Sequence, residues 1–185
     1  MINYEYKVTI GFPVYNVEKY VYKSLESILA QDFDDYEVIV VDDCGTDRSM
    51  ETILELKETH SKGNHVRIIK HEQNKGLAEA RNTAIKNPKG KYIYFVDSDD
   101  RITPNALSTF YDAAEKYQAE VVIGSNYKQK GEDIWVQDGD VFPSIQFLKV
   151  GEFTSYLYQN MKDIMPNTAW NILFSIDFLN KNHLL

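Results

Sequence analysis

The sequence predicts an α/β fold, in which a mostly parallel β-sheet carries helices on both of its faces. Segments with strand-like and helix-like hydrophobic periods alternate through the first two thirds of the chain. Residues 38–41 are four consecutive aliphatic side chains, a run that suits a strand buried on both faces. Turn-forming Gly, Pro, Asn and Asp residues separate these segments. Such alternation is typical of β-α-β units and therefore of a parallel sheet.

The strands are predicted from short runs rich in β-branched and aromatic side chains. These runs cover residues 8–12, 36–41, 66–70, 92–96 and 121–123. We expect the first strand to end at Pro13, because proline lacks the N–H that a ladder hydrogen bond needs. A further short strand is expected at residues 171–174.

The helices are predicted from apolar side chains that recur every three or four residues. They cover residues 17–30, 48–59, 77–86 and 104–117, with a short one at 176–181. Asn16 is a plausible N-cap for the first helix. The expected apolar stripe of this first helix consists of Tyr20, Val21, Ser24, Leu25, Ile28 and Leu29. The second helix is expected to turn Ile53, Leu54 and Leu56 inward.

The pattern weakens after Gly124. Residues 128–142 indicate an irregular or hairpin excursion, and residues 145–161 indicate a helix interrupted by Gly151.

Composition narrows the class of protein. A chain of 185 residues is about one domain by length, and it can bury enough surface to fold without disulfides or metals. With 20 basic and 28 acidic residues the net charge is −8, so nucleic acid is a poor candidate partner. Cys44 is the single cysteine, which excludes a disulfide framework and a thiolate metal cluster.

The sequence shows neither the apolar core of a signal peptide at its N-terminus nor a run of about 20 apolar residues. We therefore expect a cytoplasmic protein. Peripheral association with the inner face of the membrane, through a C-terminal segment absent from this sequence, stays open.

Acidic side chains follow two of the predicted strands. Asp42, Asp43 and Asp47 follow the second strand, and Asp97, Asp99 and Asp100 follow the fourth. Because parallel strands end at one edge of the sheet, where ligands bind, both groups should lie at that edge. Crowded carboxylates repel one another unless a cation lies between them, so we expect Mg²⁺ or Mn²⁺.

Each feature also has a purely structural explanation. The acidic segments 42–47 and 97–100 could form turns and helix caps, and Tyr15 could be a packed aromatic. Arg81 could be an ordinary solvated or ion-paired side chain. The four histidines, His60, His65, His71 and His183, show no metal-ligand spacing, and we assign them no role. The coincidence of both acidic groups at one edge favours the ligand site.

The known phosphate-binding loops are missing. The sequence contains no G-x-x-x-x-G-K-[ST], and Gly45 and Gly76 belong to no G-x-G-x-x-G. A nucleotide at this edge would therefore need a metal to bridge its phosphates, with help from Lys75 or Arg81.

Five blocks of the sequence resemble family 2 glycosyltransferases, which have the GT-A fold, and in particular those of the bacterial polysaccharide type. The blocks occur in the same order as in that family. Together they span residues 7 to about 124, and they lie at 8–20, 27–33, 40–47, 74–82 and 95–100. Gly11, Phe12 and Cys44-Gly45 depart from the usual residues without changing a charge. Residues 169–174 with 177–179 resemble the acceptor-side segment of these transferases.

The resemblance implies an inverting transfer of a sugar from a nucleotide diphosphate sugar, such as a UDP-sugar, to a hydroxyl of a glycan or lipid-linked acceptor. Residues 97–99 would form the D-x-D motif, in which Asp99 holds Mn²⁺ or Mg²⁺ and Asp97 holds the ribose or a metal-bound water. Asp43 would accept the N–H of a uracil-like ring, and Pro13 and Tyr15 would line its slot. Further donor-pocket residues would be Asn74, Gly76, Arg81 and Ser98.

The resemblance also implies a division of the chain. Residues 1–124 would be the nucleotide-sugar-binding half, and 125–185 part of an acceptor-binding half, within one GT-A-like domain that is truncated at its C-terminus. An inverting displacement needs a general base. We expect that base beyond Leu185, and only the positions of Glu152 and Asp163 make them candidates.

One function of another class stays open at this point, and a receiver domain is discounted. The chain could bind a nucleotide sugar or a partner subunit without turnover. A phospho-acceptor receiver domain also clusters carboxylates at strand ends, but it would need its acidic pair after the first strand, and Asp42 and Asp43 follow the second.

Overall fold

The computed structural model describes residues 3–130, 135–138, 148–149, 151–152, 155–156 and 170–184. The chain divides into two compact units. The first consists of Met1–Val122 together with Ile172–Leu185, and the second consists of Ile123–Asn171. The segment from Ile172 onward therefore packs with the N-terminal part of the chain.

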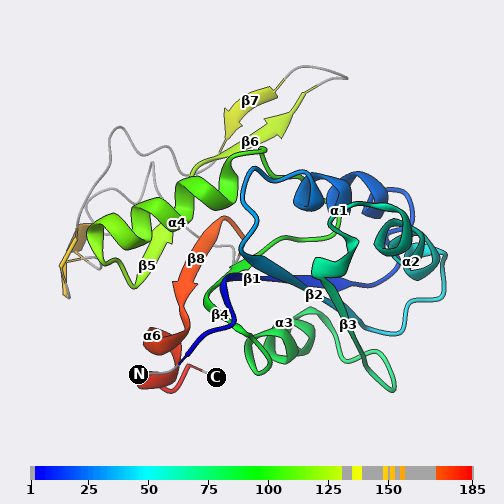
Figure 1. The fold of residues 1–185 in the computed structure, drawn as a ribbon, viewed down its shortest axis with the longest axis horizontal. Coiled ribbons are helices and arrows are strands. Elements are labelled where there is room, and N and C mark those ends of the chain that lie inside the picture. Colours follow the sequence, from blue (N-terminus) through cyan, green and yellow to red (C-terminus); the bar gives the residue numbers. More distant parts are fainter. Residues whose placement is uncertain are drawn as a thin grey trace. The chain divides into compact units, whose positions relative to one another are not determined.

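A six-stranded sheet in the order β3-β2-β1-β4-β8-β5 forms the centre of the fold (Figure 1). Its strands are β1 (Tyr6–Val14), β2 (Tyr36–Asp42), β3 (Val66–Lys70), β4 (Gly90–Phe95), β5 (Val121–Ile123) and β8 (Ile172–Ser175). β1 pairs in parallel with both β2 and β4, and β2 pairs in parallel with β3. The prediction of a mostly parallel sheet is confirmed.

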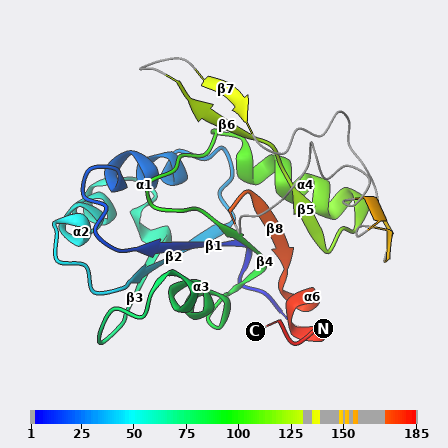
Figure 2. The same cartoon turned by 180° about the vertical axis from the view of Figure 1, so that it is seen from behind.

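Helices cover both faces of this sheet, as predicted (Figures 1 and 2). They are α1 (Val21–Leu29), α2 (Ser49–Thr59), α3 (Leu77–Ile85), α4 (Ala106–Tyr117) and α6 (Ile176–Lys181), with a 3₁₀ turn at Gly63–His65. α1, α2 and α4 share one hydrophobic cluster with the sheet, and α3 and α6 share the other.

Strand β2 shows why the sheet needs cover on both sides. All seven of its residues are buried. Val38 and Val40 pack into the cluster of α1, α2 and α4, whereas Ile39 and Val41 pack into the cluster of α3 and α6. Side chains alternate between the faces of a strand, so a continuous aliphatic run requires two covered faces.

The expectation that β1 ends at Pro13 is wrong, because the strand continues to Val14. The backbone polar groups of Gly11 point toward β4, since its carbonyl accepts from the N–H of Val96. Pro13 lies two residues further along the strand, so its backbone nitrogen points toward the same side. The register with β4 extends only to Gly11, opposite Phe95. A proline N without hydrogen therefore interrupts no ladder bond at this position.

The start of the first helix also differs from the expectation. The helix begins at Val21, and residues 17–20 form a turn that leads into it, in which the N–H groups of Tyr20 and Val21 donate to the carbonyl of Val17. Asn16 is not its N-cap, since its Oδ1 accepts from the N–H of Thr46 at 2.7 Å. Tyr20 is exposed and does not belong to the buried stripe. Leu54 of α2 is likewise exposed, whereas Ile53 and Leu56 are buried as predicted.

The later elements are close to the prediction, but their order in the sheet is not sequential. β8 pairs antiparallel with β4, and in the strand order it lies between β4 and β5. The predicted strand at 171–174 and short helix at 176–181 are confirmed as β8 and α6. In the second unit, β6 (Asn126–Gln129) and β7 (Trp135–Asp138) form an antiparallel pair, as the expected hairpin requires.

The predicted helix at 145–161 lies largely outside the described residues. Within the described part of the chain, no helix has the length and apolarity needed to cross a membrane.

Candidate functional site

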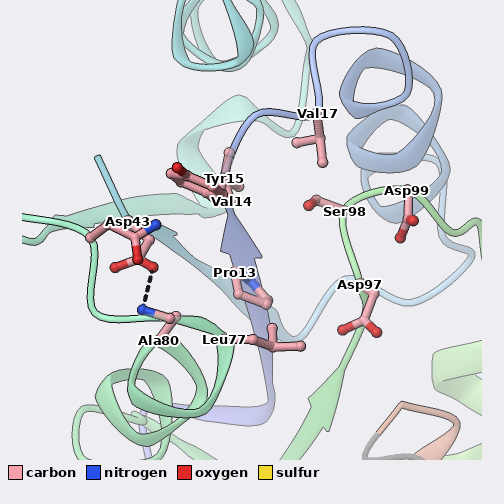
Figure 3. Close-up of a pocket in the computed structure, with 12 residues that line it drawn as sticks. Pro13, Val14, Tyr15, Val17, Asp43, Leu77, Ala80, Asp97, Ser98 and Asp99 are labelled. Carbon is pink, nitrogen blue, oxygen red and sulfur yellow. Dashed lines mark hydrogen bonds between the residues drawn. The ribbon is translucent and has the colours of Figure 1, made fainter. Parts of the chain in front are cut away.

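A cleft of about 440 Å³ opens at the carboxyl ends of β1, β2 and β4 (Figure 3). It lies where ligands bind in open α/β sheets, as the sequence predicts. Its walls come from the end of β1, from the loops that follow the first four strands, and from the start of α3. The lining residues are Pro13, Val14, Tyr15, Val17, Asp43, Asn74, Gly76, Leu77, Ala80, Asp97, Ser98 and Asp99.

Asp43 provides a buried carboxylate to one side of the cleft. Its Oδ1 accepts from His71 Nδ1 at 2.6 Å and from the N–H of Lys75 at 2.8 Å. Its Oδ2 accepts from the N–H of Gly76 at 2.8 Å. A carboxylate offers about four acceptor positions, so Oδ2 retains one for a ligand.

The charge of Asp43 is stabilised by these three donors. Burial alone raises the pKa of the Asp43 carboxyl, but the hydrogen bonds from His71, Lys75 and Gly76 outweigh burial and bring the pKa below its ordinary value. Asp43 is therefore an ionised acceptor at neutral pH, which suits it to bind an N–H group.

Gly76 makes this arrangement possible at the start of α3. It precedes Leu77 with a φ of 83°, in the region that glycine adopts without strain. A side chain there would meet no heavy atom within 4 Å, so only the backbone conformation requires glycine. This conformation is part of the turn from which the N–H groups of Lys75 and Gly76 reach Asp43.

Asp97 lies across the cleft from Asp43 (Figure 3). Arg81 Nη2, from α3, donates to its Oδ1 at 2.6 Å. The loop is closed by the N–H of Asp100, which donates to the Asp97 carbonyl at 2.9 Å. Ser24 of α1 also donates to this carbonyl, at 3.4 Å. Arg81 thus reaches the site through Asp97 and is not among the residues that line the cleft.

Negative charge accumulates in this loop. Asp99 lines the cleft with an exposed side chain. Desolvation, together with the neighbouring carboxylates of Asp99 and Asp97, raises the pKa of Asp100 to about 6. A divalent cation would relieve this repulsion.

The loop fits a metal that is shared with a phosphate ligand. Mg²⁺ is usually bound by one or two carboxylates together with substrate phosphates and water. Asp99 and Oδ2 of Asp97 offer such a set of hard oxygen ligands. Among the described residues, no three His, Cys, Asp or Glu side chains gather into a metal-binding group.

The turn-and-cap explanation holds for the neighbours of Asp43. Asp42 Oδ1 accepts from the N–H of Cys44 at 3.0 Å, as in an Asx turn. Asp47 Oδ1 accepts from both the N–H and the hydroxyl of Ser49 at the start of α2. Asp43 is the one of these three carboxylates that lines the cleft.

The remaining wall is mostly apolar. Tyr15 is 49% exposed and Leu77 is 50% exposed, and both line the cleft. The alternative that Tyr15 is a packed aromatic is therefore wrong. An exposed aromatic ring beside Pro13 offers a flat apolar surface to a planar ligand.

The structure brings together Pro13, Tyr15, Asp43, Asn74, Gly76, Asp97, Ser98 and Asp99 in one cleft. Sequence reasoning missed four apolar lining residues, Val14, Val17, Leu77 and Ala80, and the histidine behind Asp43. Their residue types carry no chemical signal, and His71 has no partner nearby in the sequence. Of the two candidate bases, Glu152 accepts from the N–H of Lys149 in the second unit, and Asp163 lies outside the described residues.

Comparison with known proteins gives consistent results. Residues 9–179 match the sequence model of a family described as glycosyl transferase family 2. Glycosyltransferase GlyA of Streptococcus pneumoniae is 36% identical over 172 residues, which are 91% of this chain and 24% of that protein. Poly(ribitol-phosphate) beta-glucosyltransferase of Bacillus spizizenii is 40% identical over 121 residues, which are 64% of this chain and 19% of that protein.

A solved structure shows the same fold. The crystal structure of S. aureus TarS in complex with UDP-GlcNAc superimposes with a TM-score of 0.69 and 26% sequence identity. The match covers 96% of this chain and 47% of the TarS chain. The chain thus spans about half of that TarS chain and a quarter or less of the two curated relatives.

Proposed function

The chain belongs to glycosyl transferase family 2, and from this premise we propose that its cleft binds a nucleotide diphosphate sugar, the donor of a sugar transfer. Its six-stranded sheet and its likeness to TarS make the fold GT-A-like. The observation that supports the proposal is the placement of Asp43 and of the Asp97–Asp99 loop on two sides of one cleft (Figure 3). The first suits a nucleobase, and the second suits a metal-bound diphosphate.

The nucleobase would lie beside Tyr15 and Pro13, with its edge toward Asp43. Uracil carries an imide N–H, and the ionised carboxylate of Asp43 has one acceptor position left on Oδ2. A charge-assisted hydrogen bond of this kind is stronger than one between neutral groups. The UDP-GlcNAc complex of TarS supports uracil as the base for this chain.

The diphosphate would lie toward Asp97 and Asp99. These side chains would hold Mn²⁺ or Mg²⁺, which offsets the charge that develops on a departing diphosphate. Arg81 keeps part of the charge of Asp97 neutralised through its 2.6 Å hydrogen bond. Without the divalent cation, the carboxylates of Asp97 and Asp99 would both face an anionic ligand.

The reaction would be a transfer of the sugar to a hydroxyl of a cell-surface glycan or lipid-linked acceptor, with inversion at the anomeric carbon. The names of the relatives support a glycan-related acceptor, since one acts on poly(ribitol-phosphate). A single displacement needs a base on the face of the sugar opposite the leaving group. The cleft residues described above bind and orient the donor, and we assign the base to none of them.

A thermal-shift screen tests this function. The chain is heated with UDP, GDP and CDP, and with UDP-glucose and UDP-GlcNAc, each with and without Mn²⁺. We expect uridine nucleotides to raise the melting temperature, and Mn²⁺ to increase that rise, because ligands of the native state stabilise it. Equal shifts for all three bases, or no shift with any nucleotide, would contradict the proposal.

A further inference from the structure

His71 lies directly behind Asp43 and is almost completely buried. It follows β3, and its N–H donates to the carbonyl of Asp42 at 2.9 Å, which fixes its backbone to the end of β2. Its ring Nδ1 is 2.6 Å from Asp43 Oδ1, and its Nε2 is 2.8 Å from the hydroxyl of Thr83 on α3. Three elements therefore meet in one line of polar contacts, Thr83–His71–Asp43.

The chemistry of the three groups sets the direction of the hydrogen bonds. The ionised carboxylate of Asp43 can only accept, so His71 Nδ1 must carry a hydrogen. In a neutral imidazole the other nitrogen, Nε2, then accepts, and its donor is the Thr83 hydroxyl. The structure therefore assigns the Nδ1–H tautomer to neutral His71.

This line of contacts leaves one atom of Asp43 for a ligand. Oδ1 is occupied by His71 and by the N–H of Lys75, whereas Oδ2 accepts only from Gly76 among the described residues. The terminal torsion of an aspartate is soft, and without His71 the carboxylate would be held only by the N–H groups of two adjacent residues, Lys75 and Gly76. The bond from His71 opposes rotation about this torsion and keeps the open position of Oδ2 in place.

We propose that His71, supported by Thr83, is a positioning residue that holds the Asp43 carboxylate in the orientation that selects a nucleobase with an imide N–H. The proposal rests on the proposed function, since it explains how that function distinguishes one base from another. A merely structural histidine would contribute to stability and leave base selectivity unchanged.

The test measures selectivity and stability separately. UDP and UDP methylated at N3 are titrated calorimetrically into the 185-residue chain with Mn²⁺. The dissociation constant of the methylated nucleotide divided by that of UDP reports recognition of the N–H. The variants are His71→Leu, which removes both contacts, Thr83→Val, which removes only the supporting hydroxyl, and His71→Asn, whose amide can still donate toward Asp43.

His65 provides the matched control. It lies at the opposite end of β3, where its Nδ1 is 2.9 Å from the carbonyl of Tyr36 and its ring packs against the Tyr36 ring. His65→Gln should lower the melting temperature without changing the ratio of the two dissociation constants. This control separates loss of stability from loss of selectivity.

We expect His71→Leu to lower the ratio about tenfold, which is the scale of one hydrogen bond in a binding site. Thr83→Val should lower it by a smaller factor, and His71→Asn should restore part of it. If the variants fold and keep the wild-type ratio, the positioning role is wrong. If the wild type itself does not distinguish the two nucleotides, the proposed function fails instead.

A second measurement does not depend on ligand or on variant folding. Two-dimensional ¹H–¹⁵N spectra through long-range couplings identify the tautomer of each histidine in the wild-type chain. We expect Nδ1 of His71 to carry a hydrogen. A neutral Nε2–H form would overturn the inference, because that tautomer has no hydrogen to donate to Asp43.

Discussion

Arg81 Nη2 donates a 2.6 Å hydrogen bond to Asp97 Oδ1 and thereby joins α3 to the acidic loop after β4. Both side chains are about one-fifth exposed, at 20% and 22%. The Nε of Arg81 is buried and has no hydrogen-bond partner among the residues that the structure describes. The pair therefore brings one fixed positive charge to a loop that otherwise contains three carboxylates.

Replacement of Arg81 should have opposite effects on the two ligands of this loop. In Arg81→Met, Asp97 loses its partner, and the loop becomes more negative. We expect the variant to bind Mn²⁺ alone more tightly and to bind UDP in the presence of saturating Mn²⁺ about tenfold more weakly. Calorimetric titrations of each ligand measure both changes. A change of the same sign for Mn²⁺ and UDP would contradict the assignment of Arg81.

Asp43 should contribute strongly to nucleotide binding. We expect Asp43→Ala to weaken UDP binding by about 1.5–3 kcal/mol, the loss typical of a charge-assisted hydrogen bond. Stability should also fall, because the N–H groups of Lys75 and Gly76 lose their acceptor. Calorimetry below the melting transition isolates the binding effect.

Asp47→Ala is the matched control for Asp43. Asp47 also accepts three hydrogen bonds, two from Ser49 and one from the N–H of Glu18, but it does not line the cleft. The control should lose stability and keep the UDP affinity of the wild type. Equal losses of affinity in the two variants would refute a direct role for Asp43.

Asp100 should make stability depend on pH. Its pKa is raised from 3.8 to about 6 by desolvation and by Asp99 and Asp97, so folding favours the protonated carboxyl. Its contribution to the free energy of unfolding is complete below about pH 4 and is lost as the pH rises through about 6. Asp100→Asn cannot ionise and should therefore be more stable than the wild type above pH 6.

The comparison uses urea denaturation of both proteins in EDTA at about pH 3, where ionisation of Asp100 should cost the wild type no stability, and at about pH 7.5, where that cost should be complete. The advantage of Asp100→Asn should appear only at the higher pH. An advantage of equal size at both values would show that ionisation of Asp100 is not the cause.

Gly11 is predicted to be coupled to Phe95 across β1 and β4. A Cβ at Gly11 would lie 2.5 Å from Phe95 Cε1 and 3.2 Å from the Cβ of Ala84. Overpacking of this kind costs about 1–3 kcal/mol, so Gly11→Ala should be destabilised by that amount. In a Phe95→Leu background the Cε1 atom is gone and the cost should fall. A double-mutant cycle by urea denaturation measures this coupling, and additive effects would contradict the contact.

The fold was predictable from the sequence because the local period of the hydrophobic side chains indicates each strand and each helix. The run 38–41 predicted a strand with two covered faces, and β2 has them. The edge of the site followed from topology alone, because parallel strands place their following loops together. The positions of Asp43, Asp97 and Asp99 directly after strands were therefore enough to assign all three to one cleft.

The errors share a physical cause, which is that their partners are distant in the sequence. Asn16 has the residue type of a helix cap, but its side chain bonds to Thr46, 30 residues away. His71 meets Asp43 and Thr83 from two other elements, so no local spacing reveals it. The insertion of β8 between β4 and β5 depends on a segment that returns from the end of the chain.

The most direct test of the central claim is a calorimetric titration of UDP into the wild-type chain and into Asp99→Asn, each with Mn²⁺ and with EDTA. Asp99 is exposed at the cleft, so its charge serves a ligand and its removal should leave the melting temperature nearly unchanged. We predict that Mn²⁺ strengthens UDP binding to the wild type and has no effect on UDP binding to Asp99→Asn. Equal Mn²⁺-dependent affinity in the two proteins would contradict a metal-bridged diphosphate in this cleft.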